Sequence, residues 1–183
     1  MSIDQGSQKK IVRDSMGELE ISHDALYAAQ TQRAINNFPV SGRKLPRRFI
    51  EALILIKLNA AKANKSLQCI DGAVADSIVK ACLDLLNKPE LLDHFPVDVF
   101  QTGSGTSSNM NANEVIATLA GKIANIAVNP NDHVNFGQSS NDIIPTCIHI
   151  SSISEIKDKL MPALSHLRAV SYTHLTLPTI YSV

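Results

Sequence analysis

The amino-acid sequence predicts a mostly α-helical protein. Apolar residues recur at intervals of three and four within residues 50–61 and 75–86, which is the spacing of one face of a helix. Serine, threonine, asparagine and aspartate, which cap helix N-termini, precede several apolar runs. The 183 residues, 44% of them hydrophobic, suffice for one domain or for one domain and part of another.

The first part of the chain contains short elements. Residues 9–19 alternate loosely, which predicts an extended segment or turn. Ser22 is a candidate N-cap for a short helix that runs through residues 25–33. Phe38 and Pro39 end this helix, because proline disfavours the helical conformation of the residue before it.

Two amphipathic helices follow. The first begins at about Pro46, since proline suits the first position of a helix. Its predicted apolar face consists of Ile50, Leu53, Ile54, Leu58 and Ala61. The lysines predicted to lie off that face are Lys57, Lys62 and Lys65. The second helix runs from its predicted N-cap Asp71 and stops before Pro89. Core packing explains both helices without any chemistry.

A glycine- and hydroxyl-rich loop is the first candidate site. Residues 97–101 are β-prone and predict an extended segment, and Gly103-Ser104-Gly105 follows it. Four good N-caps then precede a helix of about residues 109–126: Thr106, Ser107, Ser108 and Asn109. A helix N-terminus offers free N–H groups and a positive dipole end to an anion. The alternative interpretation is a capped helix after an ordinary surface loop.

A second loop, residues 129–142, has the same chemistry. It is dense in asparagine, aspartate, serine and glycine, which form caps and turns. A helix is predicted from near Ile143 to about Lys159, with Pro145 in its first turn, and Pro162 starts or bends the next helix. The candidate caps are Ser139, Ser140 and Asn141. Two such helix entrances suggest a site for a small carboxylate.

Composition excludes several other functions. A formal net charge of zero, 4% aromatic residues and no tryptophan argue against nucleic-acid and acidic-membrane partners. No apolar run is long enough to span a bilayer, and the polar N-terminus lacks a secretory signal. The three scattered cysteines form no disulfide framework and fit a cytoplasmic, reducing location.

Metal and nucleotide sites are not indicated either. His133 and His149 lack the spacing of a zinc site, so each is interpreted as a polar cap or a core histidine. The glycine loop lacks the third glycine of a dinucleotide site, and no phosphate-binding lysine motif is present. The sequence therefore predicts no metal and no cofactor.

Several exact-looking blocks occur in the order known from one family. They are Asp14-Ser15-Met16-Gly17, Ala29-Gln30-Thr31-Gln32-Arg33, Asn37 through Gly42, Thr102 through Glu114, and Gln138-Ser139-Ser140-Asn141-Asp142. With them, residues 11–169 resemble the N-terminal part of class II fumarases in the fumarase/aspartase superfamily. The resemblance implies the N-terminal helical domain of that fold plus the start of its central helical bundle.

The resemblance also implies an activity, the reversible hydration of fumarate to L-malate without a cofactor. The motif positions that would contact the dicarboxylate are Ser104, Gly105, Thr106, Ser139, Ser140 and Asn141. The family's acid/base histidine and catalytic loop serine lie beyond the matched segment, so no catalytic residue is assigned and the fragment is expected to be inactive alone. The family assembles as a homotetramer whose active sites combine three subunits.

Two alternatives to a fumarase stay open. Aspartases typically carry Gly-Ala-Gly-Thr and Gln-Ser-Thr-Asn-Asp where this sequence has serine, so aspartate ammonia-lyase is the second choice. The other is a non-catalytic helical interaction fragment. A secondary dicarboxylate site of the family has a His-Pro-Asn-Asp segment, which here reads Asn129, Pro130, Asn131 and Asp132, with Ile126 in place of an arginine. These replacements put binding there in doubt.

The resemblance divides the chain into three parts. Residues 1–138 correspond to the N-terminal lyase domain, and residues 139–169 begin the central bundle. Residues 170–183 do not continue the family pattern, and Val170 through Thr179 match one reading frame of a transposase-based sequencing adapter. They are therefore predicted to be a non-native read-through tail, with a natural divergent strand as the alternative. The segment Tyr172-Thr173-His174-Leu175 is accordingly not the family's catalytic histidine segment.

Overall fold

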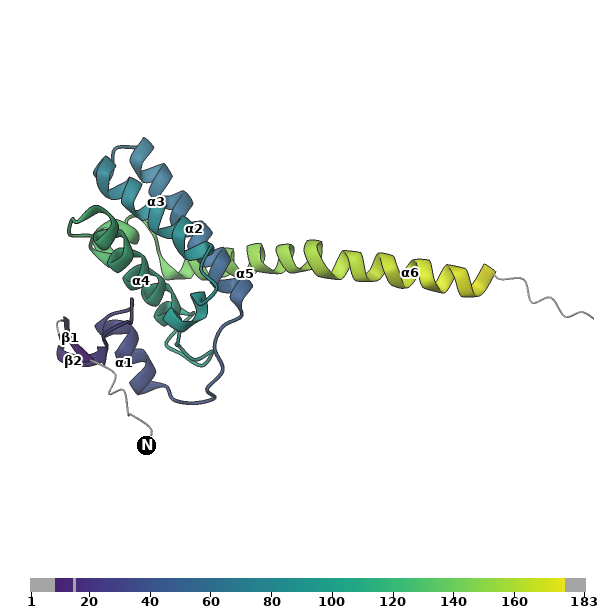
Figure 1. The fold of residues 1–183 in the computed structure, drawn as a ribbon, viewed down its shortest axis with the longest axis horizontal. Helices are drawn as coiled ribbons and strands as arrows, with labels where there is room; N and C mark the ends of the chain where they lie inside the picture. Colours follow the sequence, from purple (N-terminus) through teal and green to yellow (C-terminus); the bar gives the residue numbers. More distant parts are fainter. Residues whose placement is uncertain (1–8, 15, 177–183) are drawn as a thin grey trace, which may run out of the picture.

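The computed structural model describes residues 9–14 and 16–176, and it is mostly helical, as predicted. Three long helices form the body of the molecule: α2 (Arg47–Ser66), α3 (Gly72–Leu86) and α4 (Thr106–Ala124) (Figure 1). The first turns of α5 (Ser140–Glu155) pack against α2 and α4. The core between these helices is aliphatic and includes Leu53, Ile54, Ile78, Leu85 and Ile116.

The two predicted amphipathic helices are confirmed. The predicted apolar face of α2 is buried along its whole length. Pro46 is the N-cap of α2, one residue before the helix begins. Asp71 caps α3 as predicted, since its carboxylate accepts from the N–H groups of Ala73 and Val74 at 2.8 and 3.2 Å. Local sequence signals therefore located both helices.

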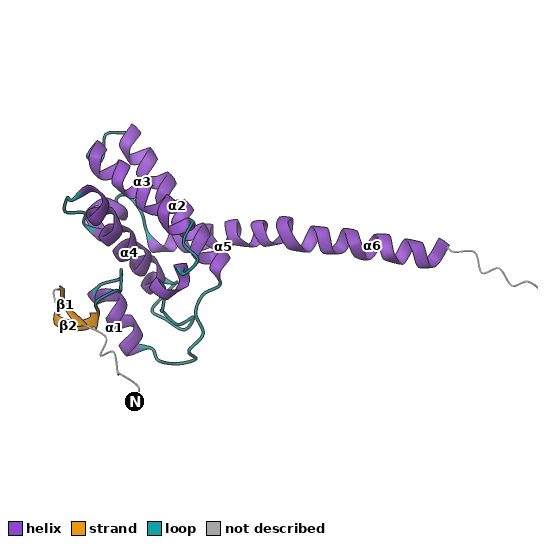
Figure 2. Ribbon diagram, viewed as in Figure 1, coloured by secondary structure: helices purple, strands orange, loops and turns teal. Residues whose placement is uncertain are grey.

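A β-hairpin and a short helix lie beside the helical body. Strands β1 (Lys9–Asp14) and β2 (Gly17–Ser22) pair antiparallel and lie next to α1 (Ala29–Asn37) (Figure 2). Arg33 of α1 binds both carboxylate oxygens of Asp14 at 2.8 Å. The guanidinium lowers the pKa of Asp14 to about 2. This ion pair fixes the hairpin to α1.

The predicted helix over residues 25–33 begins later than expected. Ser22 is the last residue of β2 rather than a helix cap, and α1 ends at Asn37 with Phe38 as its C-cap, so Phe38 and Pro39 stop the helix as predicted. Its N-terminus is capped from α4, because the buried Glu114 carboxylate accepts three backbone N–H groups at 2.9, 2.9 and 3.1 Å and the Thr31 hydroxyl at 2.6 Å. The three backbone donors belong to Ala28, Gln30 and Thr31.

The extended segment predicted over residues 97–101 is reduced to one antiparallel bridge between Asp98 and Lys44. The Asp98 carboxylate organises this corner, accepting the N–H groups of Ser41 and Gly42 at 2.8 and 2.7 Å. Hydrogen bonds to its charged form, foremost from the Phe100 N–H, lower the pKa of Asp98 to about 2. Hydrogen bonds to the Asp98 side chain therefore organise this segment more than strand pairing does.

The C-terminal helices project from the body as a long rod (Figure 1). Helix α5 passes through a π-helical turn, Ile156–Leu160, into α6 (Met161–Thr176), whose second residue is Pro162. Apolar side chains on this rod are exposed, with Ile148, Ile153 and Ile156 at 50, 63 and 46% exposure. The helix continues through position 169, and the predicted divisions of the chain at 138 and 169 stay predictions.

Within the described part of the chain, no helix combines the length and the apolarity needed to cross a bilayer.

Candidate dicarboxylate site

The first candidate loop turns into α4 through two left-handed glycines. Gly103 and Gly105 have φ values of +55° and +79°, a region that residues with a side chain rarely adopt. Gly105 is the N-cap of α4, which begins at Thr106, earlier than predicted. None of the predicted side-chain caps acts as one; the Gln101 side chain instead accepts the N–H of Ser108 at 2.8 Å. Exposed hydroxyls remain available at this entrance.

The second candidate loop leads into α5. Ser139 is its N-cap, as expected, and its hydroxyl accepts the N–H of Asn141 at 3.2 Å. Because α5 already begins at Ser140, Pro145 lies in the second turn and not in the first. Proline has no N–H, so Pro145 cannot donate to the Asn141 carbonyl, the acceptor four residues earlier in a regular helix.

The fold brings the two loops together. The Ser104 hydroxyl donates to the Asn141 side-chain oxygen at 2.7 Å, across 37 positions of sequence. Gly105 packs so closely on Ile144 that an added Cβ would lie 3.1 Å from three of its side-chain atoms. Ser104, Thr106, Ser139 and Asn141 are exposed beside this contact. Two helix N-termini thus share one polar surface, where both dipoles favour an anion.

A polar network that local sequence patterns do not predict lies beneath the loops. Lys57, predicted to lie off the apolar face of α2, is fully buried in it. Its ammonium donates to the side-chain oxygens of Asn135 and Gln138 at 2.8 and 2.9 Å. The Asn109 amide continues the network, donating to Asn135 Oδ1 at 3.2 Å and to Ser140 Oγ at 3.0 Å. The network connects α2 to the second loop and to one predicted contact residue.

The sequence did contain a signal for Lys57. This residue follows Leu53 by four positions and Ile54 by three, so helical geometry places it on the same stripe. A lysine on an apolar stripe is buried only where hydrogen-bond acceptors lie within reach of its ammonium. Those acceptors come from residues more than seventy positions later, at Asn135 and Gln138. Only the fold reveals them.

The proposed secondary site is a separate turn. Asn129 caps the π-helical turn Pro130–Val134, and its side chain accepts the N–H groups of Asn131 and Asp132 at 2.8 and 3.1 Å. His133 closes the turn, accepting the Asn129 N–H at Nδ1, 3.0 Å away. This confirms the interpretation of His133 as a polar cap. The asparagine side chain thereby occupies the donors that an anion would need.

Cavities flank the first loop on two sides. One, of about 690 Å³, is lined by Thr102, Ser107 and Asn131 together with Arg33 and Glu114. The other, of about 360 Å³, is mostly apolar and is lined by Phe49, Gly105 and Ile144, among others. The predicted dicarboxylate contacts at Ser104 and Asn141 lie on the polar surface rather than in the apolar cavity.

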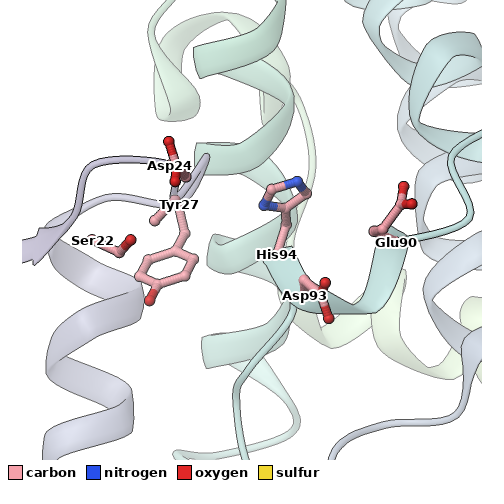
Figure 3. A pocket seen from close by; sticks show the side chains of 7 residues that line it. Ser22, Asp24, Tyr27, Glu90, Asp93 and His94 are labelled. Atoms are coloured by element: carbon pink, nitrogen blue, oxygen red, sulfur yellow. The ribbon is translucent and has the colours of Figure 1, made fainter. Parts of the chain in front are cut away.

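A smaller cavity of about 280 Å³ lies between the hairpin end and the 3₁₀ turn Leu91–His94 (Figure 3). Tyr27 and His94 line it together with three carboxylates, those of Asp24, Glu90 and Asp93. Burial is the main cause that lowers the pKa of His94. Three carboxylates repel a dianion, so this cavity does not suit a dicarboxylate.

Comparisons with known proteins place the chain among its relatives. A protein-family model described as lyase matches residues 17–173. A class II fumarate hydratase of Pseudomonas aeruginosa is 62% identical over 158 residues, covering 86% of this chain and 34% of the relative. A class II fumarate hydratase of Xylella fastidiosa is 53% identical over 168 residues, covering 92% of this chain and 35% of the relative.

Among solved structures, the class II fumarase of Schistosoma mansoni superimposes with a TM-score of 0.84 at 39% identity. The superposition covers 87% of this chain and 35% of that one. The chain thus spans about a third of the length of the relatives it matches. The family model matches well over half of the chain, and the chain therefore belongs to the lyase family.

Proposed function

We propose that this chain supplies the dicarboxylate-binding loops of a class II fumarate hydratase, which reversibly hydrates fumarate to L-malate. The hydrogen bond from Ser104 to Asn141 carries the proposal, because it joins the two helix entrances into one anion-binding surface. Thr106, Ser139 and Ser140 add hydroxyl donors, and Gly105 allows the close approach. As the resemblance to class II fumarases implies, the proposed reaction uses no cofactor and no metal.

The physical task of these donors is to stabilise negative charge. A carboxylate of the substrate takes up more charge as a proton leaves the adjacent carbon. Donors that are already oriented stabilise this charge without reorganising, which water cannot do. The remaining groups, including the acid/base histidine and catalytic serine of the family, are proposed to belong to a longer protein. We place that protein in the cytoplasm, consistent with three free cysteines in the described chain, and as a homotetramer.

Aspartate ammonia-lyase is the competing activity. Ser104 distinguishes the two because its hydroxyl makes the bond to Asn141, and an alanine at this position could not. We therefore expect the serine to favour the fumarase arrangement of the second loop. The secondary dicarboxylate site is not part of the proposal, since the Asn129 side chain already binds the N–H groups of its own turn.

The test is a chimera in which the matching segment of the Pseudomonas aeruginosa relative is replaced by residues 17–169 of this chain. We expect the folded chimera to hydrate fumarate, followed by its ultraviolet absorbance. Thr106→Val and Asn141→Ala should each lower kcat/KM about a hundredfold or more, because each removes a preorganised donor.

Thr146→Val is the matched control. Its hydroxyl is exposed on α5 and donates only to its own helix, to the Asp142 carbonyl at 2.7 Å. Its activity should stay within a factor of two. A folded chimera that releases ammonia from aspartate without hydrating fumarate would replace the proposal with the ammonia-lyase. Folded protein with neither activity would leave a helical interaction fragment.

A further inference from the structure

We propose that Lys57 is a positioning residue for the dicarboxylate site: its buried ammonium anchors the second loop and supplies the positive charge that the loops themselves lack. The inference rests on the proposed function of those loops. Asn135 and Gln138, which accept from Lys57 Nζ, lie immediately before the predicted contact residues Ser139, Ser140 and Asn141. Lys57 therefore holds the chain where it enters α5.

The buried Lys57 ammonium holds the second loop through hydrogen bonds to two of its side chains. Lys57 has no exposed surface, and an ammonium in an apolar core is costly unless it is hydrogen-bonded. Two amide oxygens meet that requirement at 2.8 and 2.9 Å. Asn135 is held in turn, because its own amide donates to the Gln138 carbonyl at 3.1 Å. These hydrogen bonds therefore hold the second loop in a fixed position relative to the Lys57 ammonium.

The ammonium lies close to the site. Three hydrogen bonds placed end to end, from Lys57 through Asn135 and Asn109, reach the Ser140 hydroxyl. The six predicted contact residues carry no charge, whereas the substrate is a dianion. Within a protein the attraction between opposite charges at such a separation stays appreciable, because screening is weaker than in water. A single buried cation can therefore complement the substrate without contacting it.

Among the described residues, no carboxylate shifts the pKa of Lys57. The titratable group that does shift it is the Cys82 thiol of α3. Burial raises the pKa of that thiol to about 12, so the thiol is neutral. The groups that face Nζ from the second loop are the neutral amides of Asn135 and Gln138, and α4 adds the neutral Asn109. Burial lowers the pKa of Lys57 to about 7.

The direction of the pH effect follows. Below about pH 7 Lys57 is an ammonium, and above it the side chain becomes a neutral amine. A bound dianion favours the charged form, so ligand binding and proton uptake at Lys57 strengthen each other. Affinity for the dicarboxylate should be highest at low pH within the folded range and should fall about tenfold between pH 6 and pH 8.5.

The kinetic test uses the chimera described above, with KM and kcat for L-malate measured from pH 6 to 8.5. Lys57→Met should raise KM about tenfold at pH 6 while kcat changes less than threefold, the pattern of lost ground-state binding. In the parent, KM should rise as the pH increases through about 7, and Lys57→Met should lack this rise. Lys57→Arg, which stays charged, should keep KM low at pH 8.5. Lys62→Met, at an exposed position of α2, is the control.

Parallel KM profiles in the parent, Lys57→Met and Lys57→Arg would overturn the inference. A measurement on the present chain, which needs no enzymatic activity, distinguishes failure of the Lys57 inference from failure of the proposed function. In a chain with isotopically labelled lysines, the signal that is absent from Lys57→Met and from Lys57→Arg should titrate near pH 7, and amides 135–138 should exchange faster in Lys57→Met than in Lys62→Met. A midpoint near 10, or unchanged exchange, would overturn the anchor whatever the chimera does. If Lys57→Met does not fold, the titration and Lys57→Arg still decide.

Discussion

Gly105 combines two constraints at one position. Its φ of +79° disfavours any side chain, and a Cβ would press against Ile144 at 3.1 Å. Gly42 has a similar φ of +69°, but nothing lies within 4 Å of a Cβ placed there. The pair therefore separates the cost of the backbone conformation from the cost of the close contact between the loops.

We expect Gly105→Ala to lower the free energy of unfolding by about 3 kcal/mol, from backbone strain and overpacking together. Gly42→Ala should cost about 1 kcal/mol, from backbone strain alone. Urea unfolding of both variants measures the difference. Equal costs would mean that Ile144 yields without penalty and that the approach of the two loops at Gly105 is not tightly packed.

At the scale of elements, the capping of α1 by Glu114 is a long-range interaction. Helix α1 has no side-chain cap of its own, and its N-terminal N–H groups bind a carboxylate on α4 instead. The same contact fixes α1, and through the Arg33 to Asp14 ion pair the hairpin, against the helical body. One buried side chain thus connects two elements that local sequence patterns treat separately.

Replacing Glu114 with alanine should lower the free energy of unfolding by about 3 kcal/mol, because several partly buried donors lose a charged acceptor at once. Glu114→Gln should cost less, since one amide oxygen still accepts. Chemical denaturation gives the cost, and faster amide exchange of Gln30 and Thr31 would localise it to α1. Glu18→Ala, at an exposed hairpin position, serves as the control. A similar loss in both alanine variants would contradict the capping role.

At the scale of the whole molecule, the α5–α6 rod leaves an apolar stripe in solvent. Its residues recur every three or four positions, and each is between 46 and 63% exposed: Ile153, Ile156, Leu160, Leu164 and Leu167. This is the pattern of a helix that packs against other helices. An apolar surface of this kind favours self-association of the chain.

The double substitution Ile153→Gln and Leu167→Gln should therefore reduce self-association of the chain, as measured by sedimentation velocity across a concentration series. Ile11→Gln is the matched control, since Ile11 is 68% exposed but lies on the hairpin, away from the rod. Sedimentation that stays unchanged in the double variant, or that changes equally in the control, would show that the stripe does not drive association.

The sequence by itself determined the helical class, α2 and α3 with their apolar faces, the Asp71 and Ser139 caps and the two hydroxyl-rich helix entrances. These features depend on residues within one or two turns of each other, so local patterns contain them. Only the tertiary structure decided where α1 begins, that Ser104 bonds Asn141 and that Lys57 is buried beneath the loops. Each of these depends on a partner far along the chain, such as Glu114 or Asn135, and a buried polar group is stable only once folding has supplied that partner.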